Sequence, residues 1–389
     1  MKVSFCPRKA RFISLILCCA LFTAALSIPA ESVEKSPSFE GGISAESAIL
    51  MNWEDGIFLF EKNPDRKMGE ASTTKIMTAL VVCETMSLDG VIAVPPEAVG
   101  VEGSSVYLQN GELLSVRDLL FALLLESAND AAVALAIASA GSVSAFAELM
   151  NERASQLGLK NTHFTNPHGL YDEEHYTTAR DLALITAEAL KNPELCEIFK
   201  ARRATIPSGI GIESSEQASV RYLYNHNKML SLCEGAIGVK TGYTRDTGRC
   251  LVSAAARDGM TLICVTLRAP DDWNDHLSLL EFGFASYSRV ELYGIGELCF
   301  PYAVSGGNEQ YVTATNSEPL IMTLPKGFGD TPINSFEFPQ HFELAPIEED
   351  AELGKVTVSL GERQISSPLV AAYSVSAASA DHRKRFIFF

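Results

Sequence analysis

Residues 70–86 read EASTTKIMTALVVCETM, in which a polar start containing serine, threonine and lysine leads into an apolar run. Hydroxyl groups followed by apolar residues predict a buried helix over 72–86. Ser72 and Lys75 are three residues apart, so a helix would place them on one face. A serine hydroxyl becomes a nucleophile only when a neighbouring group takes its proton. A lysine whose pKa is lowered by burial and by nearby positive charge can do so.

This four-residue pattern is a weak signal by itself. Residues 32–35 read Ser-Val-Glu-Lys and fit it equally well, although they lie in a polar stretch with no helix to orient them. A serine at the start of a helix is also an ordinary cap. A purely structural interpretation of Ser72 therefore stays open at this point.

A second motif, Ser127-Ala-Asn129, falls at the break between two apolar helical segments. A hydroxyl at such a break can relay a proton, and an amide can hold a substrate carbonyl or a lysine. A polar cap between two helices is the simpler interpretation of this motif taken alone.

A third motif, Lys240-Thr241-Gly242, ends a predicted strand. A lysine and a hydroxyl beside a strand can bind a carboxylate, and a glycine leaves room for another backbone to approach. The backbone N–H of the following Tyr243 could help to bind an oxyanion. A solvated lysine at the end of a strand is the alternative.

The surrounding sequence predicts an α+β domain, a mostly antiparallel sheet covered by helices. Asp55-Gly56 lies between two alternating runs, 48–53 and 57–61, which indicates a hairpin. Ser115 and Asp118 have the spacing of a capping box in front of an apolar helix. We predict further helices at 128–140, 142–157, 178–191 and 275–287, and strands at 236–241, 249–256 and 260–267.

From about residue 293 the pattern changes to short β-like runs separated by Gly, Pro and Asn. Runs at 310–314, 320–324 and 355–360 predict a small C-terminal β-sandwich-like domain. The predicted organisation is a signal peptide at 1–30, a linker at 31–41, the main domain at 42–292, the β domain at 293–375 and a tail at 376–389.

The first 30 residues have the layout of a secretory signal, which predicts an exported protein. Basic residues come first, an uncharged apolar run follows over 12–26, and small residues lie near 27–30. The run is short for a spanning helix; an uncleaved anchor is the alternative. Cleavage removes four positive charges and changes the formal net charge from −17 to −21.

This acidic balance argues against nucleic acid as a partner, because nucleic-acid binding needs a basic surface. It also disfavours broad adhesion to anionic lipid. The tail ends in Arg383-Lys-Arg-Phe-Ile-Phe-Phe389, which allows peripheral membrane contact but is too short to span a bilayer; a frayed end is the alternative. Six cysteines lie outside the signal without Cys-x-x-Cys spacing, so we expect buried free thiols rather than a zinc or redox site.

The three motifs in this order are similar to the set known from β-lactamases and penicillin-binding proteins. The sequence closely resembles the D-alanyl-D-alanine carboxypeptidases among the low-molecular-mass penicillin-binding proteins. The resemblance covers nearly the whole mature chain. Besides the motifs, it is carried by NPHGL at 166–170, HYTTARDLALI at 175–185, NHNKML at 225–230, LPKG at 324–327 and PLVA at 368–371.

The resemblance implies a β-lactamase/transpeptidase-like fold and a serine-type hydrolase. Such an enzyme removes the terminal D-alanine from peptidoglycan stem peptides that end in D-Ala-D-Ala, on the wall side of the plasma membrane. β-Lactam antibiotics would be covalent inhibitors. The family uses no metal or other cofactor, so His163, His168 and His175 would not be ligands.

The resemblance also implies roles for individual residues. Ser72 would be the nucleophile and Lys75 its base, with Ser127 and Asn129 on the side of the proton relay. On the opposite side, the terminal carboxylate of the substrate would be bound by Lys240 and Thr241, with Gly242 beside them. The N–H groups of Ser72 and Tyr243 would form the oxyanion hole.

The sequence departs from the family pattern in three places. Glu70 stands where many members have proline, and Thr247 replaces the usual alanine after the third motif. Some members also carry an arginine before the closing helix that helps to hold the substrate carboxylate, and 269–276 contains none. Arg249 and Arg268 are the candidates to replace it.

Two other functions compete with the carboxypeptidase. A serine β-lactamase would need a carboxylate that activates water for deacylation; 166–170 offers none, although Glu173 and Glu174 are near. A catalytically silent wall-binding protein would keep the fold without the chemistry. Retention of every reactive side chain in the three motifs argues against it.

Overall fold

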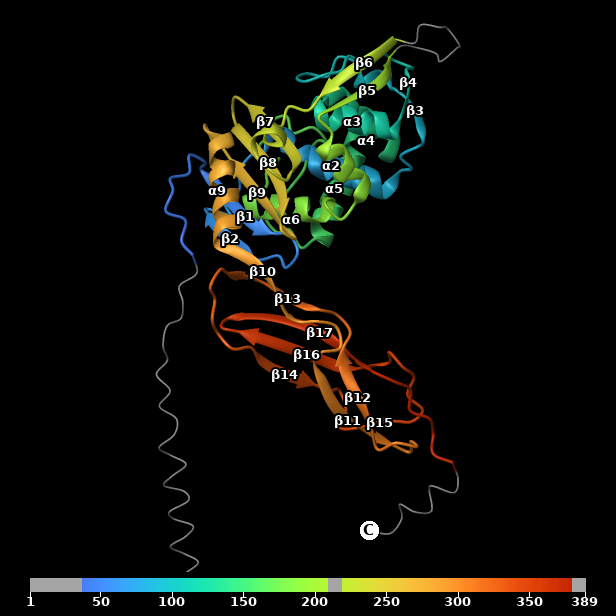
Figure 1. The fold of residues 1–389 in the computed structure, drawn as a ribbon. Helices are drawn as coiled ribbons and strands as arrows, with labels where there is room; N and C mark the ends of the chain where they lie inside the picture. The colour runs from blue at the N-terminus through green and yellow to red at the C-terminus, as the bar shows by residue number, and fades with distance from the viewer. Residues whose placement is uncertain (1–36, 209–218, 380–389) are drawn as a thin grey trace, which may run out of the picture.

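The computed structural model describes residues 37–208 and 219–379. The predicted signal peptide, 1–30, lies outside the described residues, as do part of the predicted linker, 31–41, and most of the predicted tail, 376–389. Figure 1 shows two bodies, a larger one of helices around a sheet and a smaller one built of strands.

The larger body is organised around a five-stranded sheet in the order β2-β1-β9-β8-β7, in which every neighbouring pair is antiparallel. Its strands are β1 (Ser47–Asn52), β2 (Phe58–Lys62), β7 (Ala236–Thr244), β8 (Gly248–Arg257) and β9 (Met260–Leu267). The prediction of a mostly antiparallel sheet is therefore confirmed. β7 lies at an edge of this sheet, which leaves one of its sides without a strand partner from the sheet.

Helices cover both faces of the sheet because side chains alternate between the faces along each strand. On one face, Ile49 and Met51 of β1 belong to the large core that contains most of the helices. On the other face, Ala48 and Leu50 pack with helix α9 (Asp272–Ser286). The helices are η1 (Ala71–Thr74), α2 (Lys75–Thr85), η2 (Pro96–Ala98), α3 (Val116–Leu125), α4 (Asn129–Ala140), α5 (Val143–Gln156), α6 (Ala179–Ala189), α7 (Pro193–Lys200), α8 (Met229–Leu232) and α9 (Asp272–Ser286).

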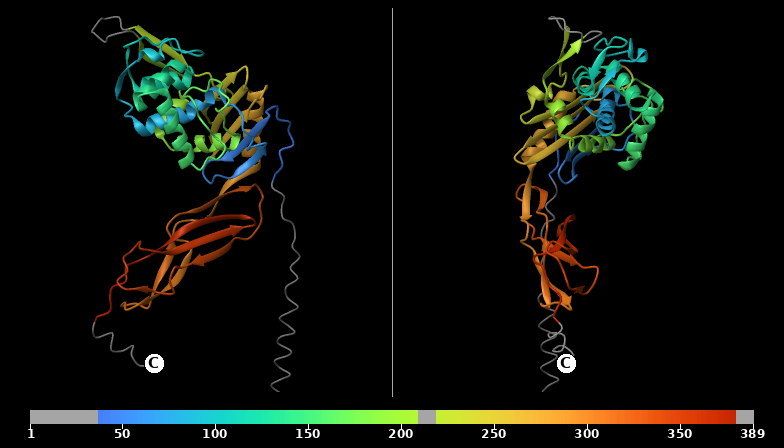
Figure 2. Two further views of the ribbon diagram at one scale, coloured as in Figure 1. Left: turned by 180° about the vertical axis from the view of Figure 1, so that it is seen from behind. Right: turned by 90° about the vertical axis from the view of Figure 1, so that its right-hand side faces the viewer.

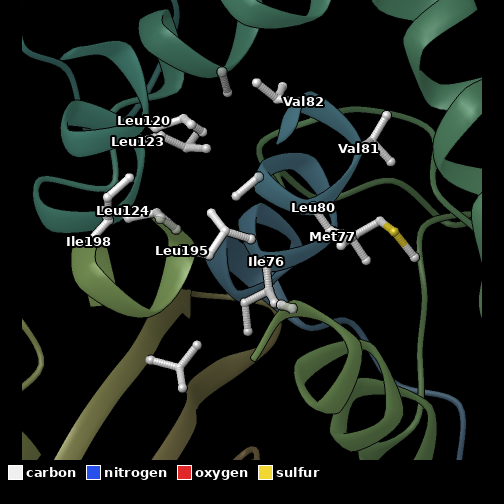
Figure 3. Close-up of a cluster of buried hydrophobic side chains, with 14 of the residues drawn as sticks. Ile76, Met77, Leu80, Val81, Val82, Leu120, Leu123, Leu124, Leu195 and Ile198 are labelled. Carbon is white, nitrogen blue, oxygen red and sulfur yellow. The ribbon is translucent and has the colours of Figure 1, made fainter. Parts of the chain in front are cut away.

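Helix α2 lies at the centre of the large core, and eight of its residues, from Lys75 to Val82, are buried. Figure 3 shows apolar side chains of α3 and α7 converging on it, among them Leu120, Leu123, Leu195 and Ile198. Burial of α2 on every side over these residues explains why most of them are apolar. The start of α2 is therefore held by rigid surroundings.

The predicted helix over 72–86 begins differently from the expectation. Its first turn is the 3-10 helix η1, and regular α-helix starts only at Lys75. Ala71, just before Ser72, has a left-handed backbone with φ of 49°, which bends the chain sharply. Neither η1 nor α2 has a side-chain cap, so Ser72 does not serve as the capping residue.

Other local predictions agree with the structure to within a few residues, and the predicted strand 260–267 coincides with β9. The predicted capping box is present, because the Ser115 side chain accepts from the Asp118 N–H and the Asp118 carboxylate accepts from the Ser115 N–H. Elements that the sequence analysis missed include helix α7 and two antiparallel strand pairs, β3 (Val91–Ala93) with β4 (Leu113–Ser115) and β5 (Arg203–Ser208) with β6 (Ser219–Tyr224).

The smaller body has its own apolar core and a six-stranded sheet in the order β14-β16-β17-β12-β11-β15, beside the pair β10-β13. Its strands are β10 (Tyr287–Tyr293), β11 (Cys299–Ser305), β12 (Tyr311–Asn316), β13 (Leu320–Pro325), β14 (Ile333–Glu337), β15 (Glu343–Leu344), β16 (Glu352–Leu360) and β17 (Arg363–Ala371). Figures 1 and 2 show that it meets the larger body at one end and extends away from it.

All six cysteines outside the predicted signal are free thiols; three are buried, Cys83 and Cys196 are half-buried and Cys299 is exposed. Among the described residues, no single helix has the length and apolar character needed to cross a membrane. Helices α4 and α5 meet both criteria only as a pair, and the chain bends by 82° between them.

Candidate active site

A hollow of about 420 Å³ opens where the start of η1, the junction of α3 and α4, and the edge strand β7 meet. Its wall includes five of the predicted site residues, Ser72, Ser127, Thr241, Gly242 and Tyr243. The other three predicted residues, Lys75, Asn129 and Lys240, are buried and do not line it. Segments separated by more than 160 residues of sequence thus form one concave site.

Lys75 lies beneath the hollow and reaches toward Ser72. Its Nζ is 3.1 Å from Ser72 Oγ, 2.7 Å from Asn129 Oδ1 and 2.8 Å from the carbonyl oxygen of His168. Two of these neighbours are acceptors only. A neutral amine can donate its two N–H groups to them and direct its lone pair at the serine hydroxyl.

The neutral amine is also favoured by the surroundings of Lys75. The side chain is completely buried, and burial lowers its pKa well below the ordinary value of 10.5; the positive charge of Lys240 lowers it further, while Asp130 opposes the shift. An amine with a lowered pKa can accept a proton near neutral pH. The geometry and the electrostatics therefore both suit a general base.

Asn129 is held in the orientation that presents its oxygen to Lys75. Its Nδ2 donates to the carbonyl of Glu102 at 2.6 Å, and its backbone N–H donates to the carbonyl of Ser104 at 2.7 Å. The next residue, Asp130, accepts from Ser105 Oγ at 2.6 Å. These contacts fix the amide, because a flipped amide would point its N–H groups at Lys75 and its oxygen at the carbonyl oxygen of Glu102.

Ser127 has a strained backbone and an unused hydroxyl. Its φ is 60°, a left-handed conformation that is unfavourable for residues other than glycine. Only 6% of the residue is exposed, and its Oγ has no hydrogen-bond partner among the described residues. Strained residues and unpaired polar groups concentrate at functional sites, and here the free hydroxyl belongs to a residue that lines the hollow.

The third motif packs directly against the backbone of the first. A Cβ on Gly242 would lie 2.9 Å from the carbonyl oxygen of Glu70 and 3.1 Å from the nitrogen of Ser72. A larger residue would push β7 away from η1. The glycine therefore permits the close approach that brings the backbone of Tyr243 to the Ser72 side of the hollow.

Lys240 lies behind the wall of the hollow with 1% of its surface exposed. Its Nζ donates to the carbonyl of Thr241 at 3.1 Å, and it forms no ion pair within residues 37–208 and 219–379. Burial lowers its pKa to about 7, although the negative charge of Glu126 raises it. A ligand carboxylate would supply the missing counter-charge.

A second cation, Arg249, also lines the hollow. It donates from Nε and Nη2 to Asp272 Oδ1, and its guanidinium lies 5.7 Å from the ring centre of Trp273. Arg268, the other candidate, donates to the carbonyls of Asp246 and Thr247 and does not line the hollow. The structure thus distinguishes between the two arginines.

The sequence analysis missed several lining residues, namely Ser104, His226, Lys228, Asp272 and Trp273. None belongs to a short catalytic motif, and each reaches the hollow through tertiary packing. Four of them lie in two stretches named in the sequence analysis, 225–230 and 269–276, for which no role was predicted. Both stretches line the hollow beside β7, which carries the third motif. Only the folded structure brings them there, so the sequence could not have predicted it.

The described residues contain no cluster of three or more His, Cys, Asp and Glu residues that could hold a metal ion. The ring of His168 is neutral at neutral pH, because burial lowers its pKa to about 3. Glu173 and Glu174, the carboxylates considered for a β-lactamase, are exposed and do not line the hollow. Among the described residues that line the hollow, the one carboxylate is Asp272, which is paired with Arg249.

Comparisons with known proteins match both parts of the chain. The family model described as D-alanyl-D-alanine carboxypeptidase matches residues 31–271, and that described as penicillin-binding protein 5, C-terminal domain, matches 287–377. The D-alanyl-D-alanine carboxypeptidase DacF of Bacillus subtilis is 31% identical over 86% of both chains. DacC of Escherichia coli is 31% identical over 90% of this chain and 88% of its own.

Solved structures of similar proteins share the fold. Penicillin-binding protein 5 of Haemophilus influenzae superposes with a TM-score of 0.72, at 29% identity, over 87% of this chain and all of its own. The DD-transpeptidase of Streptomyces K15 has a TM-score of 0.58 at 34% identity and matches 63% of this chain, which corresponds to 98% of its own.

Proposed function

Since this chain belongs to the D-alanyl-D-alanine carboxypeptidase family and is a serine-type hydrolase of peptidoglycan metabolism, we propose that Ser72 is its nucleophile and Lys75 the general base. The observation that carries this assignment is the distance of 3.1 Å between Ser72 Oγ and a buried Lys75 Nζ whose pKa is lowered. Asn129 Oδ1 and the His168 carbonyl can accept the two N–H groups of the neutral amine. The Ser72 hydroxyl is then the group that Lys75 can deprotonate.

In the acylation step, the Ser72 hydroxyl passes its proton to Lys75 while Oγ attacks the carbonyl carbon of the D-Ala-D-Ala amide. The carbonyl oxygen becomes an oxyanion, for which we assign the N–H groups of Ser72 and Tyr243 as donors. This assignment rests on the close approach of β7 to η1 at Gly242. Two fixed backbone donors need no reorganisation as the charge develops.

Collapse of the tetrahedral intermediate breaks the C–N bond, and the leaving amine of D-alanine needs a proton. Ser127 is suited to deliver it, because its Oγ lines the hollow and has no partner of its own. The proton on Lys75 can replace the one that Ser127 gives away. Water then attacks the acyl group on Ser72, with Lys75 as base, and regenerates the serine.

Recognition of the substrate terminus is assigned to the strand side of the hollow. Lys240 and the Thr241 hydroxyl would bind the terminal carboxylate, supported by Arg249. The free edge of β7 would accept an extended peptide as an additional strand. Because the chain has a formal net charge of −17, and would have −21 after the predicted cleavage, attraction of an anionic substrate must come from these local cations.

The partners implied are stem peptides ending in D-Ala-D-Ala and, as covalent inhibitors, β-lactam antibiotics. In a β-lactam the amide that Ser72 opens lies in a ring, so the leaving group stays attached to the acyl-enzyme. Export to the wall side of the membrane follows from the predicted signal peptide at 1–30 and from the location of the peptidoglycan substrate. Contact of the tail with the membrane stays a prediction.

Mass spectrometry tests this proposal. The purified protein should remove one alanine from a D-Ala-D-Ala pentapeptide, and peptide mapping after penicillin treatment should place the adduct on Ser72. The Ser72→Ala variant should do neither. An adduct on Ser32, or on no serine, would show that the nucleophile is assigned wrongly.

A further inference from the structure

Glu70 is a completely buried acid two residues before Ser72, and the catalytic steps above do not use it. Its carboxylate Oε1 lies 3.1 Å from His175 Nε2 and 3.1 Å from Thr74 Oγ1, whereas Oε2 has no partner among the described residues. His175 is also buried. Burying an acid costs free energy unless it is paired and fully hydrogen-bonded, and one oxygen of this acid is not. This cost raises the question of what Glu70 holds in place.

Hydrogen bonds around His175 fix the direction of the contact. The backbone N–H of Thr165 donates to His175 Nδ1 at 3.1 Å, so Nδ1 carries no proton. The ring proton is therefore on Nε2, which faces Thr74 Oγ1 at 2.9 Å and Glu70 Oε1. Since Thr74 Oγ1 accepts from the imidazole, its own single proton has two acceptors in reach, the carbonyl of Ala71 at 2.8 Å and Glu70 Oε1 at 3.1 Å, and the Ala71 carbonyl is the nearer.

This chain of contacts ends at Ala71, whose backbone is strained. Ala71 has φ of 49°, and left-handed backbone persists in a non-glycine residue only when its surroundings hold it there. Its carbonyl oxygen accepts a hydrogen bond from Thr74 Oγ1. Gly169 packs against the same oxygen so closely that a Cβ at this position would come within 1.9 Å of it. The next residue along the chain is Ser72.

The same contacts join η1 to the loop 163–175, which also touches the base. The carbonyl of His168, in this loop, accepts from Lys75 Nζ at 2.8 Å, and the carbonyl of Pro167 accepts from Thr78 Oγ1 at 2.6 Å. A shift of the loop relative to η1 would therefore change the position of Lys75 as well as that of Ser72. Glu70 and His175 lie where the two segments meet.

We propose that Glu70 and His175 are positioning residues of the acylation step, which through Thr74 hold the Ala71 peptide so that Ser72 Oγ faces Lys75. The proposal rests on the assignment of Ser72 as nucleophile. Loss of Glu70 or His175 should slow the chemical step but should not weaken the initial non-covalent complex with the ligand, because neither side chain lines the hollow. Misplacement of a reacting group by about 1 Å can cost roughly 100-fold in rate.

The test measures penicillin acylation over a range of concentrations, which separates the dissociation constant of the non-covalent complex from the limiting acylation rate. Glu70→Ala and His175→Ala should each lower the limiting rate about tenfold or more and leave the dissociation constant within about threefold. Their double variant should be no slower than either single variant, because both remove the same support. Glu70→Gln, which keeps an acceptor at Oε1, should recover the rate to within about threefold of wild type.

Asp181→Asn is the matched control. Asp181 is another buried carboxylate, which accepts from the Asn161 N–H and from Thr162 Oγ1 and, within the described part of the chain, forms no hydrogen bond or ion pair with residues 70–75. This variant should lower the melting temperature and leave the limiting rate of the folded protein unchanged. If Glu70→Ala does not fold, the limiting acylation rate of Thr74→Val tests the positioning role instead. This variant removes the hydroxyl that links His175 to Ala71 and changes the shape of the side chain little.

Wild-type limiting rates in folded Glu70→Ala and His175→Ala, or in Thr74→Val, would overturn the positioning role. So would a Glu70→Gln variant as slow as Glu70→Ala, because the contact at Oε1 would then not be what matters. A wild-type protein whose adduct is not on Ser72 would instead overturn the proposed function. The two failures are thus distinguishable in one set of measurements.

Discussion

Arg249 donates from Nε at 3.0 Å and from Nη2 at 2.8 Å to one oxygen of Asp272, Oδ1, in the wall of the hollow that contains Ser72. Both donors approach the same oxygen. The guanidinium is partly exposed, with 41% of the side chain accessible, so it can also donate to a ligand. The pair holds a cation near the strand side of the hollow while the rest of the chain is strongly acidic.

We predict that Arg249→Ala reduces turnover of a D-Ala-D-Ala peptide about three- to tenfold, because a partly exposed ion pair contributes less than a buried one. The comparison is with Arg268→Ala, which should stay within about twofold of wild type since Arg268 points to backbone carbonyls outside the hollow. Steady-state kinetics on the two variants decides. A larger loss for Arg268 would reverse the assignment.

Lys240→Gln should have a stronger effect than either arginine variant. Loss of a charge-assisted hydrogen bond costs about 1.5–3 kcal/mol, or roughly ten- to a hundredfold in turnover. The measurement compares the free acid and the C-terminal amide of one peptide. Wild type should prefer the acid, and the variant should lose that preference; a variant that still discriminates as well as wild type would place the carboxylate site elsewhere.

Substrate binding should weaken as the pH rises through about 7. Burial lowers the pKa of Lys240 to about 7, so the side chain is a cation below that pH and neutral above it. The KM for the free acid should therefore rise on the alkaline side, while the KM for the amide stays flat. Lys240→Arg keeps its charge throughout this range and should flatten the profile if it binds substrate; an unchanged rise would point to another group.

Lys75→Ala should abolish acylation by penicillin, since it removes the proposed base, whose Nζ lies 3.1 Å from Ser72 Oγ. The fold should persist, because truncation also relieves the burial of a polar group in an apolar helix. Mass spectrometry of the adduct and a melting curve give the two readouts. Near-normal acylation in a folded variant would mean that another group serves as base.

The main domain should function without the smaller body. Residues 31–292 contain every site residue, and the Streptomyces K15 enzyme matches only 63% of this chain over 98% of its own. Because β10 pairs with β13, a second variant that ends at residue 286 avoids an unpaired strand. Both should be acylated by penicillin; a folded but inert protein would show that the C-terminal part completes the site.

Much of the local structure could be predicted from sequence because its causes are local. The capping box of Ser115 and Asp118 involves neighbouring groups, and the run 260–267 has the composition and turn residues of a strand. The start of the helix at 72–86 could not be predicted in this way. Its first turn depends on the left-handed Ala71, whose carbonyl packs against Gly169, almost a hundred residues further along the chain, where no Cβ would fit.

The sequence by itself determined which reactive groups the chain carries, their order, and the family they indicate. Tertiary structure alone decided how those groups act on one another. Lys75 meets Asn129 and His168, 54 and 93 residues away, and burial lowers its pKa. Arg249 rather than Arg268 reaches the hollow for the same reason. A hydrogen bond between distant segments and the desolvation of a charge both depend on what the whole fold packs together, which no short stretch of sequence contains.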